Sequence, residues 1–346
     1  MTKKKILVTG GAGFIGGNFV QYMVGKYPGY DVYNLDVLTY AGDLTKHGDI
    51  EKNENYYFVK ADIIDYDVIL ALFEKEKFDY VVHFAAESHV DRSITDPAVF
   101  VSTNVLGTQV LLDAARQVGI TKFVHISTDE VYGELDFDPT TFFTEETPLQ
   151  PHSPYSASKA SSDFLVQAYH HTYGMPINIT RCSNNYGPYH FPEKLIPLTI
   201  SRAVNEEKVP IYGDGRNIRD WLHVFDHCVA IDLVLHEGVN GEVYNVGGHN
   251  EQTNLEVVKT IINTLGKSEE LIEFVADRLG HDKRYAIDAT KLEQLGWQPM
   301  YNFETGIAQT IQWYLENKEW WGQIISGEYQ KYLEINSSYS SEVISK

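Results

Sequence analysis

ILVTGGAGFIGGNFV, residues 6–20, is the stretch of sequence that decides the fold. An apolar run of strand character leads into a glycine series, Gly10, Gly13 and Gly16, and then into the start of a helix. Such a turn lets the backbone approach a pyrophosphate closely, while the first N–H groups of the helix face the anion. A glycine-rich turn alone is weak evidence, but this strand–turn–helix context is the one that a dinucleotide site requires. The stretch therefore predicts the first unit of a nucleotide-binding sheet.

The alternation of strand and helix continues to about residue 185. Further strands are expected at 30–36, 55–62, 78–86, 121–128 and 175–182. These runs are almost continuously apolar, which is typical of strands that are covered on both faces. Helices are expected at 14–26, 65–77, 97–118 and 154–173. This pattern predicts an α/β fold with a doubly wound, Rossmann-like parallel sheet.

The rhythm loosens after about Tyr186, where 188–198 and 212–224 read as loops. Later elements are expected as helices at 225–236, 255–265 and 303–320 and strands at 242–248 and 272–277. We expect a cofactor-binding domain over 1–185, to which 222–248 returns. A smaller, mixed α/β substrate-binding region should cover 186–330, followed by a flexible tail over 337–346.

The overall composition restricts the possible partners. A formal net charge of -20 repels nucleic acids and anionic membranes. Cys182 and Cys228 lie far apart with no CxxC spacing, which favours a reducing compartment. No apolar run approaches the roughly 20 residues that span a bilayer, so a cytoplasmic protein is expected. The histidines lack metal-ligand spacing, and His83 and His125 are expected as hydrogen-bonded core residues rather than metal ligands.

A carboxylate ends the second expected strand. Asp36 lies twenty residues after Gly16, where it can accept hydrogen bonds from both ribose hydroxyls of an adenosine. Its charge repels a 2′-phosphate and no arginine follows it, which favours NAD over NADP. Asp62 ends the next strand, where it either receives the adenine amino group or closes a turn.

Two further groups carry the expected chemistry. Tyr155 and Lys159 are four residues apart and share one face of a helix. A nearby ammonium favours the tyrosinate, which can then take a proton from a sugar hydroxyl. Thr128, Asp129 and Glu130 follow the fifth strand at its carboxyl end, where ligands bind in parallel sheets. Elimination of water requires both an acid and a base, and two adjacent carboxyls with separated proton affinities can provide them.

The combined motifs resemble a known family. GGAGFIG (10–16), STDEVYG (127–133), YSASK (155–159) and RCSNNYGPYHFPEKLIP (181–197) look like the extended short-chain dehydrogenase/reductase family. Its dTDP-glucose 4,6-dehydratase branch is resembled by LTYAGDL (38–44), AAESHVDRSI (85–94), GDGRNIRDWLHV (213–224), YNVGGHNE (244–251) and DRLGHDKRYAID (277–288). Leu279 stands where that family has a proline.

This resemblance implies a nucleotide-sugar dehydratase of deoxysugar biosynthesis that keeps its NAD between turnovers and forms a homodimer through helices 97–118 and 154–173. It implies that Tyr155, with Lys159 and Thr128, serves the sugar 4-hydroxyl, that Glu130 removes the C5 proton, and that Asp129 protonates the leaving 6-hydroxyl. The implied cofactor-binding residues are Gly10, Gly13, Phe14, Ile15, Gly16, Asp36, Asp62, Ile63, Ala85, Ala86, Asn104, Tyr155 and Lys159. The implied substrate-binding residues are Ser88, Thr128, Asn184, Lys194, Leu195, Pro210, Tyr212, Arg219, Asn254, Arg278 and His281.

Two other functions fit parts of the pattern. A sugar-nucleotide epimerase or decarboxylase would use the same scaffold but has no need of an acid at Asp129. A non-catalytic NAD-binding protein would need none of the five catalytic candidates. The preference for thymidine over uridine or cytidine rests on the resemblance alone.

Overall fold

A seven-stranded parallel sheet forms the larger part of the molecule, and the computed structural model describes residues 3–277 and 280–326 of the chain. The strands run in the order β10-β6-β5-β4-β1-β2-β3, and each neighbouring pair is parallel. Their bounds are β1 Lys4–Thr9, β2 Tyr30–Asp36, β3 Tyr56–Lys60, β4 Tyr80–His83, β5 Lys122–Thr128, β6 Ile177–Cys182 and β10 Val243–Val246. The predicted doubly wound sheet is confirmed.

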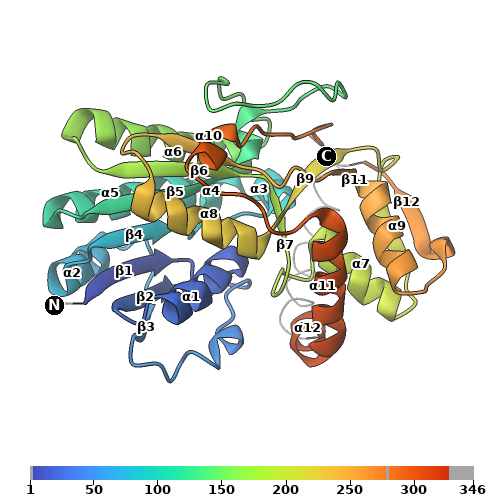
Figure 1. The fold of residues 1–346 in the computed structure, drawn as a ribbon, viewed down its shortest axis with the longest axis horizontal. Helices are drawn as coiled ribbons and strands as arrows, with labels where there is room; N and C mark the ends of the chain where they lie inside the picture. The colour runs from blue at the N-terminus through green and yellow to red at the C-terminus, as the bar shows by residue number, and fades with distance from the viewer. Residues whose placement is uncertain (1–2, 278–279, 327–346) are drawn as a thin grey trace.

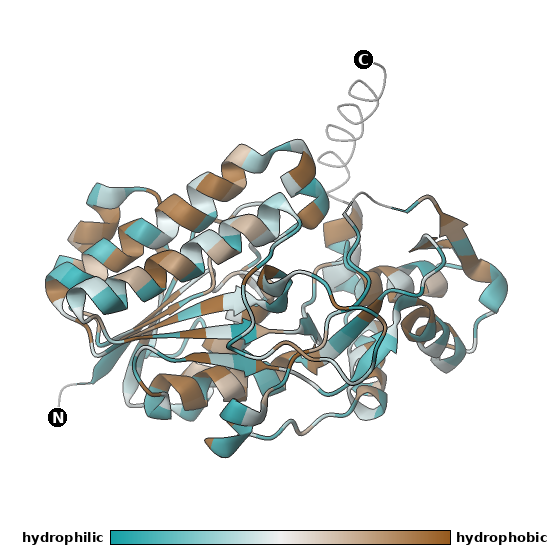
Figure 2. Ribbon diagram, turned by 90° about the horizontal axis from the view of Figure 1, so that it is seen from above, coloured by the Kyte–Doolittle hydropathy of each residue, from teal (hydrophilic) through white to brown (hydrophobic). Residues whose placement is uncertain are grey.

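Helices cover both faces of this sheet (Figures 1 and 2). One face carries α1 (Phe14–Lys26) and α8 (Val224–Glu237), and the other carries α2 (Tyr66–Glu76), α5 (Gly107–Val118) and α6 (Pro154–Tyr173). Successive residues of β1 alternate between the two cores, with Ile6 and Val8 in one and Leu7 in the other. This double burial explains why the strands are apolar throughout.

Local sequence signals set the helix bounds. The expected helices 14–26 and 154–173 have those bounds in the structure. α6 begins with a capping box between Ser153 and Ser156, has Pro154 in its first turn, and ends at Gly174 with φ +67°. α2 begins one residue later than expected because Asp65 is its N-cap and accepts a hydrogen bond from the Val68 N–H.

The helix expected at 97–118 is interrupted by a π-helical segment. It comprises α4 (Pro97–Phe100), η2 (Val101–Leu106) and α5, and the short α3 (Val90–Thr95) precedes it. Gly107 packs so closely on Ile63 that an added Cβ would lie 2.5 Å from Cδ1 of that side chain. The π-helical segment buries Asn104 inside the molecule, and such segments are frequent at functional sites.

The span Pro97–Val118 also differs from the sequence-based expectation in its length as an apolar helix. The span has 22 residues, and its most apolar 18-residue window has a mean hydropathy of 1.3. By length and composition it could cross a bilayer, contrary to the expectation that no run in the chain would be long and apolar enough. Half of its most apolar window is buried, and α5 packs between α2 and α6. The span is thus a covering helix of the sheet.

A smaller lobe lies beside the carboxyl edge of the large sheet (Figure 1). Its helices are α7 (Leu195–Val204), α9 (Asn254–Thr264), α11 (Phe303–Glu316) and α12 (Lys318–Ser326). Its strands are β7 (Asn184–Tyr186), β9 (Ile218–His223) and β11 (Glu251–Thr253) in one sheet, and β8 (Val209–Tyr212) and β12 (Ile272–Val275) in another. The remaining short elements of the described residues are η1 (Thr45–His47) after β2, η3 (Asp129–Tyr132) after β5, η4 (Glu269–Leu271) before β12, and α10 (Thr290–Gln294) before α11.

Three predictions for this lobe were wrong. Residues 188–198 are not all loop, because α7 begins at Leu195 and tolerates Pro197 in its first turn, where no intrahelical N–H is required. Residues 212–224 contain β9, whose neighbours β7 and β11 bury its polar residues. The single helix expected at 303–320 ends at Asn317, and α12 restarts at Lys318. The expected flexible tail at 337–346 lies outside the described residues.

Candidate active site

A cleft of about 570 Å³ opens at the carboxyl edge of the large sheet. It is lined by the glycine loop after β1, the ends of β2, β5 and β6, the segment after β4, and the beginnings of η3 and α6. Residues 189–195, which lead into α7, and Trp221 of β9 line it from the smaller lobe. Ligands of open α/β sheets bind at this edge.

The glycine loop has the shape of a phosphate cradle. Gly10 has φ +70°, and an added Cβ would lie 2.6 Å from the Ala85 nitrogen. A Cβ on Gly16 would lie 2.3 Å from the Gly10 carbonyl oxygen, so the helix start can pack this closely only with glycine there. Gly13 is the N-cap of α1 and has no side chain to occupy the first N–H groups of the helix. These groups remain available to an anion.

Asp36 is held rigidly at the end of β2. Its two carboxylate oxygens accept hydrogen bonds from the backbone N–H groups of Ala12 (3.0 Å) and Leu38 (2.8 Å). Burial raises the pKa of Asp36, while these N–H groups oppose the shift. A fixed carboxylate here fits the ribose of an adenosine, and Asp62 lies in the same cleft.

Tyr155 and Lys159 lie in the first two turns of α6, both buried. The Lys159 ammonium donates to the Ile126 carbonyl at 2.7 Å, and burial lowers the pKa of Lys159 to about 8 against the opposing effect of Asp163. The Thr128 hydroxyl lowers the pKa of Tyr155, but by less than the causes that raise it. Burial first, and then the Glu130 carboxylate, raise the pKa of Tyr155 well above its usual value. Within the chain alone, these causes outweigh the lowering of the Tyr155 pKa that was expected from the Lys159 ammonium. Formation of the tyrosinate therefore requires a further positive charge beside the ring.

The two adjacent carboxyls have different environments. Asp129 is 2% exposed, whereas Glu130 is only partly buried, and both line the cleft. Burial, followed by the charges of Glu130 and Asp220, raises the pKa of Asp129 well above its usual value. Asp129 Oδ1 accepts a hydrogen bond from the Thr128 hydroxyl at 3.3 Å, while Oδ2 has no hydrogen-bond partner among the described residues. Asp129 is suited to act as a protonated acid, and its buried Oδ2 has hydrogen-bonding capacity that the described residues leave unused.

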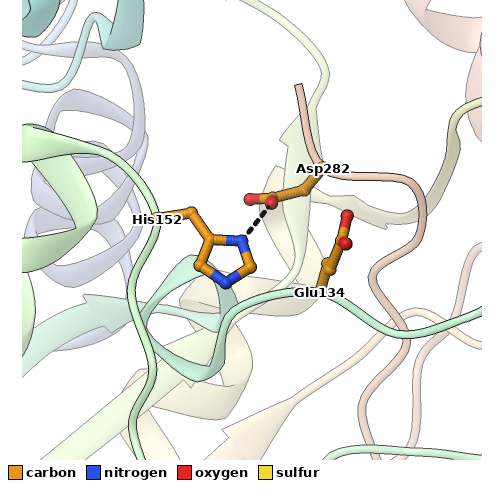
Figure 3. A group of neighbouring side chains, drawn as sticks. All are labelled: Glu134, His152 and Asp282. Carbon is orange, nitrogen blue, oxygen red and sulfur yellow. Dashed lines mark hydrogen bonds and ion pairs between the residues drawn. The ribbon is translucent and has the colours of Figure 1, made fainter. Parts of the chain in front are cut away.

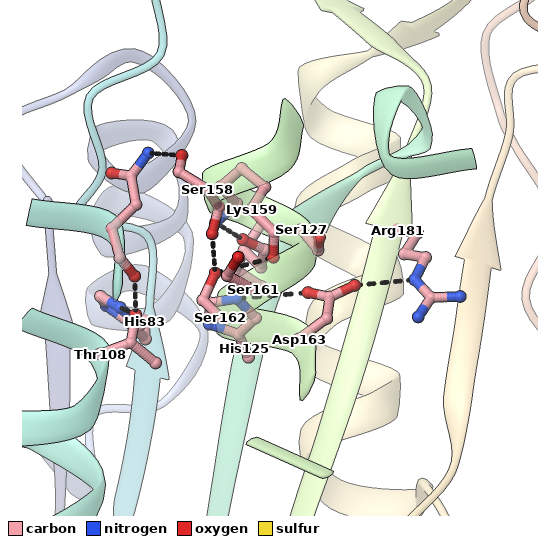
Figure 4. Close-up of polar contacts among 12 residues, drawn as sticks. His83, Thr108, His125, Ser127, Ser158, Lys159, Ser161, Ser162, Asp163 and Arg181 are labelled. Carbon is pink, nitrogen blue, oxygen red and sulfur yellow. Dashed lines mark hydrogen bonds and ion pairs between the residues drawn. The ribbon is translucent and has the colours of Figure 1, made fainter. Parts of the chain in front are cut away.

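A buried polar network supports the catalytic helix from behind (Figure 4). Asp163, two turns after Tyr155, accepts a hydrogen bond from Arg181 at 2.9 Å. His83 is hydrogen-bonded through both ring nitrogens, to Thr9 and Thr108, as expected for a core histidine. The His125 ring has no hydrogen-bond partner among the described residues, so that part of the expectation was wrong. Its Nε2 lies 3.5 Å from Oδ1 of the Asp163 carboxylate.

A second group of titratable side chains, none of which lines the cleft, comprises Glu134, His152 and Asp282 (Figure 3). His152 Nδ1 lies 2.7 Å from Asp282 Oδ1, and Glu134 provides a third ligand-type atom, all within 4.8 Å of one another. Glu134 also accepts a hydrogen bond from the Lys283 N–H at 3.0 Å. The group connects the chain just before α6 and just after η3 to the segment that begins at residue 280.

Comparison with known proteins identifies the family. The family model of GDP-mannose 4,6 dehydratase matches residues 7–310. A dTDP-glucose 4,6-dehydratase of Xanthomonas campestris pv. campestris (strain B100) is 54% identical over 343 residues, which are 94% of this chain and 97% of that protein. The chain belongs to the dTDP-glucose 4,6-dehydratase family.

Solved structures of the family have the same fold. The crystal structure of dTDP-glucose 4,6-dehydratase from Bacillus anthracis in complex with NAD is 52% identical and has a TM-score of 0.87, covering 93% of this chain and 99% of that one. DesIV, a dTDP-glucose 4,6-dehydratase of Streptomyces venezuelae with NAD and TYD bound, is 48% identical with a TM-score of 0.88, covering 92% and 99%.

Most residues that the family resemblance implicated lie together. The cleft is lined by Gly10, Gly13, Phe14, Ile15, Gly16, Asp36, Asp62, Ile63, Ala85, Ala86, Ser88, Thr128, Asp129, Glu130, Tyr155, Lys159, Asn184, Lys194 and Leu195. Asn104 lies behind the lining, where its amide bonds both backbone groups of Glu87 and the Ser158 hydroxyl. It orders the cleft wall from behind.

The remaining substrate-binding candidates do not line the cleft. They are Pro210, Tyr212, Arg219, Asn254 and His281 in the smaller lobe. Arg219 donates to the carbonyls of Ile218 and Asp282 and lies over the ring of Tyr285. Arg278 and Leu279 lie outside the described residues.

Sequence reasoning missed a cation under the glycine loop. Lys46 is 5% exposed, lines the cleft, and donates to the Gly13 carbonyl at 2.8 Å. Its side chain lies against Gly17, where an added Cβ would be 2.7 Å from Lys46 Cδ. The signal that could have found it is its place after Asp36, because a loop leaving a strand end at this edge must run past the cofactor site.

Proposed function

We propose that the protein is a dTDP-glucose 4,6-dehydratase, which converts dTDP-glucose to dTDP-4-keto-6-deoxyglucose for deoxysugar biosynthesis. The observation that carries this proposal is the buried Asp129 next to Glu130, in the same cleft as Tyr155 and Lys159. The family membership of the chain and the NAD-bound relatives support it.

Each catalytic residue is assigned a role that follows from its position in the cleft. Tyr155, in the same cleft as Thr128, takes the proton of the sugar 4-hydroxyl, and Lys159 provides a fixed positive charge close by. When held by the glycine loop and Asp36, NAD would supply the acceptor for the hydride of C4 and its donor to C6. Glu130 removes the C5 proton, which the 4-ketone has made acidic, and Asp129 protonates the departing 6-hydroxyl through Oδ2.

The cleft fits NAD in three respects. Its glycine loop excludes side chains where a pyrophosphate must approach, and Asp36 opposes a 2′-phosphate. The raised pKa of Tyr155 requires a further positive charge beside the ring, and the oxidised nicotinamide carries one.

The nucleotide end of the substrate is assigned to the smaller lobe. Lys194 and Asn184 line the cleft there, and Lys194 is suited to a diphosphate oxygen. Arg219 lies further along the same lobe and, with Arg278, is assigned to the nucleotide and its diphosphate, as are Pro210, Tyr212, Asn254 and His281. Leu195 is also assigned to the nucleotide end, and Ser88 is assigned to the sugar.

The proposal includes a homodimer in the cytoplasm. The helices named for pairing expose Val101, Leu106 and Phe164 by 57%, 47% and 58%, and an exposed apolar surface of this kind marks an association site. Both cysteines are buried and unpaired, which suits a reducing compartment.

Incubation of the purified protein with dTDP-glucose in deuterated water, without added reductant, tests the activity. We expect a 4-keto-6-deoxy product that absorbs strongly in alkali and carries deuterium at C5, and no product from Tyr155→Phe. Clean conversion to dTDP-galactose would support an epimerase instead. Retention of NAD with no conversion of any nucleotide sugar would support a non-catalytic NAD-binding protein.

A further inference from the structure

The lysine under the glycine loop has no part in the reaction steps proposed above. Lys46 belongs to η1, is 5% exposed, and lines the cleft. Its ammonium donates to the Gly13 carbonyl at 2.8 Å, and the same carbonyl also accepts a hydrogen bond from the Gly17 N–H at 3.1 Å. Gly13 is the N-cap of α1. The ammonium is therefore fixed at the residue from which this helix starts.

This position is unfavourable for a cation by itself. Burial lowers the pKa of Lys46 to about 8, against the opposing charges of Asp43 and Asp36. The N-terminus of a helix carries a partial positive charge, which repels a cation beside it. Within the described part of the chain, the ammonium has Gly13 as its acceptor and otherwise faces the Tyr189 ring, 5.9 Å from the centroid. Since an ammonium has three donor positions, the others are left for a ligand.

The distribution of charge along the cleft indicates which ligand this is. Among the described residues that line it, seven side chains are carboxyls, which repel an anion unless a cation is near. The lining contains three lysines, Lys46, Lys159 and Lys194, and no described arginine. Lys159 is held beside the catalytic tyrosine, and Lys194 comes from the smaller lobe. Lys46 is thus the cation on the side of the glycine loop, where the diphosphate of a dinucleotide binds.

We propose that Lys46 is a cofactor-binding residue that donates to the diphosphate of NAD, an inference that rests on the NAD site of the proposed function. The diphosphate provides the acceptors that the remaining donors of the ammonium lack. Its negative charge also offsets the burial of the ammonium and the repulsion by α1. Because Lys46 keeps its hydrogen bond to Gly13, one side chain holds both the glycine turn and the anion that the turn receives.

Displacement of labelled NAD from the holoenzyme tests this role. Lys46→Met removes the charge and should fold, because an apolar side chain of similar size in place of a buried charge is often neutral or stabilising. Lys46→Gln also removes the charge but keeps N–H donors. The control is Lys52→Met, which changes an exposed lysine in the same connection between β2 and β3. With unlabelled NAD as competitor, we expect the dissociation constant to rise at least about tenfold in both Lys46 variants and to stay within about twofold in Lys52→Met, given the strength of a hydrogen bond to a charged group.

Two fragments of the cofactor separate binding of the diphosphate from a role in shaping the turn. ADP-ribose contains the diphosphate, whereas adenosine contains only the base and the ribose that Asp36 is suited to bind. As competitors, we expect ADP-ribose to weaken by the same factor as NAD in both Lys46 variants and adenosine to bind them as it binds wild type. Equal weakening of adenosine would overturn the proposal, because the ammonium would then act on the turn or the ribose. Unchanged binding of NAD would overturn it as well, whereas failure of wild type to retain NAD would instead overturn the proposed function.

Discussion

Asp163→Asn should move the pH dependence of the reaction, because Asp163 is the carboxylate that favours the charged form of Lys159. The two residues are one helical turn apart, which places side chains roughly 6 Å from each other. With an effective dielectric constant of about 20, two unit charges at that distance interact by about 3 kcal/mol. Since one pKa unit corresponds to about 1.4 kcal/mol, loss of the carboxylate should lower the pKa of Lys159 by about two units.

The direction of the effect follows from the protonated state of Lys159. Activity requires the ammonium, so it is lost as pH rises through the pKa of Lys159, which is about 8 in the native chain. The upper limit of the pH–rate profile should therefore move down by about two units in Asp163→Asn. At pH 7.5 this change predicts a rate loss of more than tenfold, with a smaller loss at pH 6.

Two further variants control for loss of structure. Asp163→Asn leaves the buried guanidinium of Arg181 without its carboxylate partner, which costs about 3–5 kcal/mol of stability. The double variant Asp163→Asn/Arg181→Met removes both charges and should regain stability while keeping the shifted profile. Asp232→Asn removes an equally buried, ion-paired carboxylate from α8 and should leave the profile unchanged. A profile in Asp163→Asn within half a unit of wild type would refute the reasoning.

Three other predictions concern separate parts of the molecule. Asp129→Asn should slow water loss more than oxidation at C4, as resolved by rapid-quench mass spectrometry, and an equal effect on both steps would contradict its role as the acid. Gly16→Ala should abolish retention of NAD, measured by release of the nucleotide on denaturation, because its Cβ would lie 2.3 Å from the Gly10 oxygen. Gly25→Ala in the same helix, with open space at its Cβ, should retain the cofactor. Trp297→Ala should lower the free energy of unfolding in urea by about 3–5 kcal/mol, because the side chain is buried. NAD content per folded chain should stay the same, since Trp297 lies away from the cleft.

The large sheet could be predicted because its signals are local. Each strand is a mostly apolar run, and α6 carries its own capping box and terminal glycine, so neighbouring residues fix the helix bounds. The smaller lobe lacks such signals. β9 contains the polar residues Arg219 and Asp220, and only pairing with strands far away in the sequence buries them. The pattern of β9 itself therefore reads as a loop.

The sequence predicted which residues make up the site better than it predicted how these residues are placed relative to one another. The motifs placed nineteen candidates that line one cleft, because strand ends of a parallel sheet must meet at one edge. They did not indicate that Asn104 lies behind the wall, since that depends on a π-helical segment, which is followed by the close contact of Gly107 with Ile63. Lys46 was missed for a similar reason, as its burial depends on the absence of a side chain at Gly17.

The unequal environments of Asp129 and Glu130 arise from the way β5 ends. In a continuing strand, successive side chains would point to opposite faces of the sheet, and only one of the two carboxyls could reach the cleft. Thr128 instead caps a 3₁₀ turn by accepting the Glu130 N–H, and both carboxyls line the cleft at different depths. The hydroxyl that makes this turn also donates to Asp129 Oδ1 at 3.3 Å. A single threonine at the strand end thus turns the chain so that the buried acid and the less buried base both line the cleft.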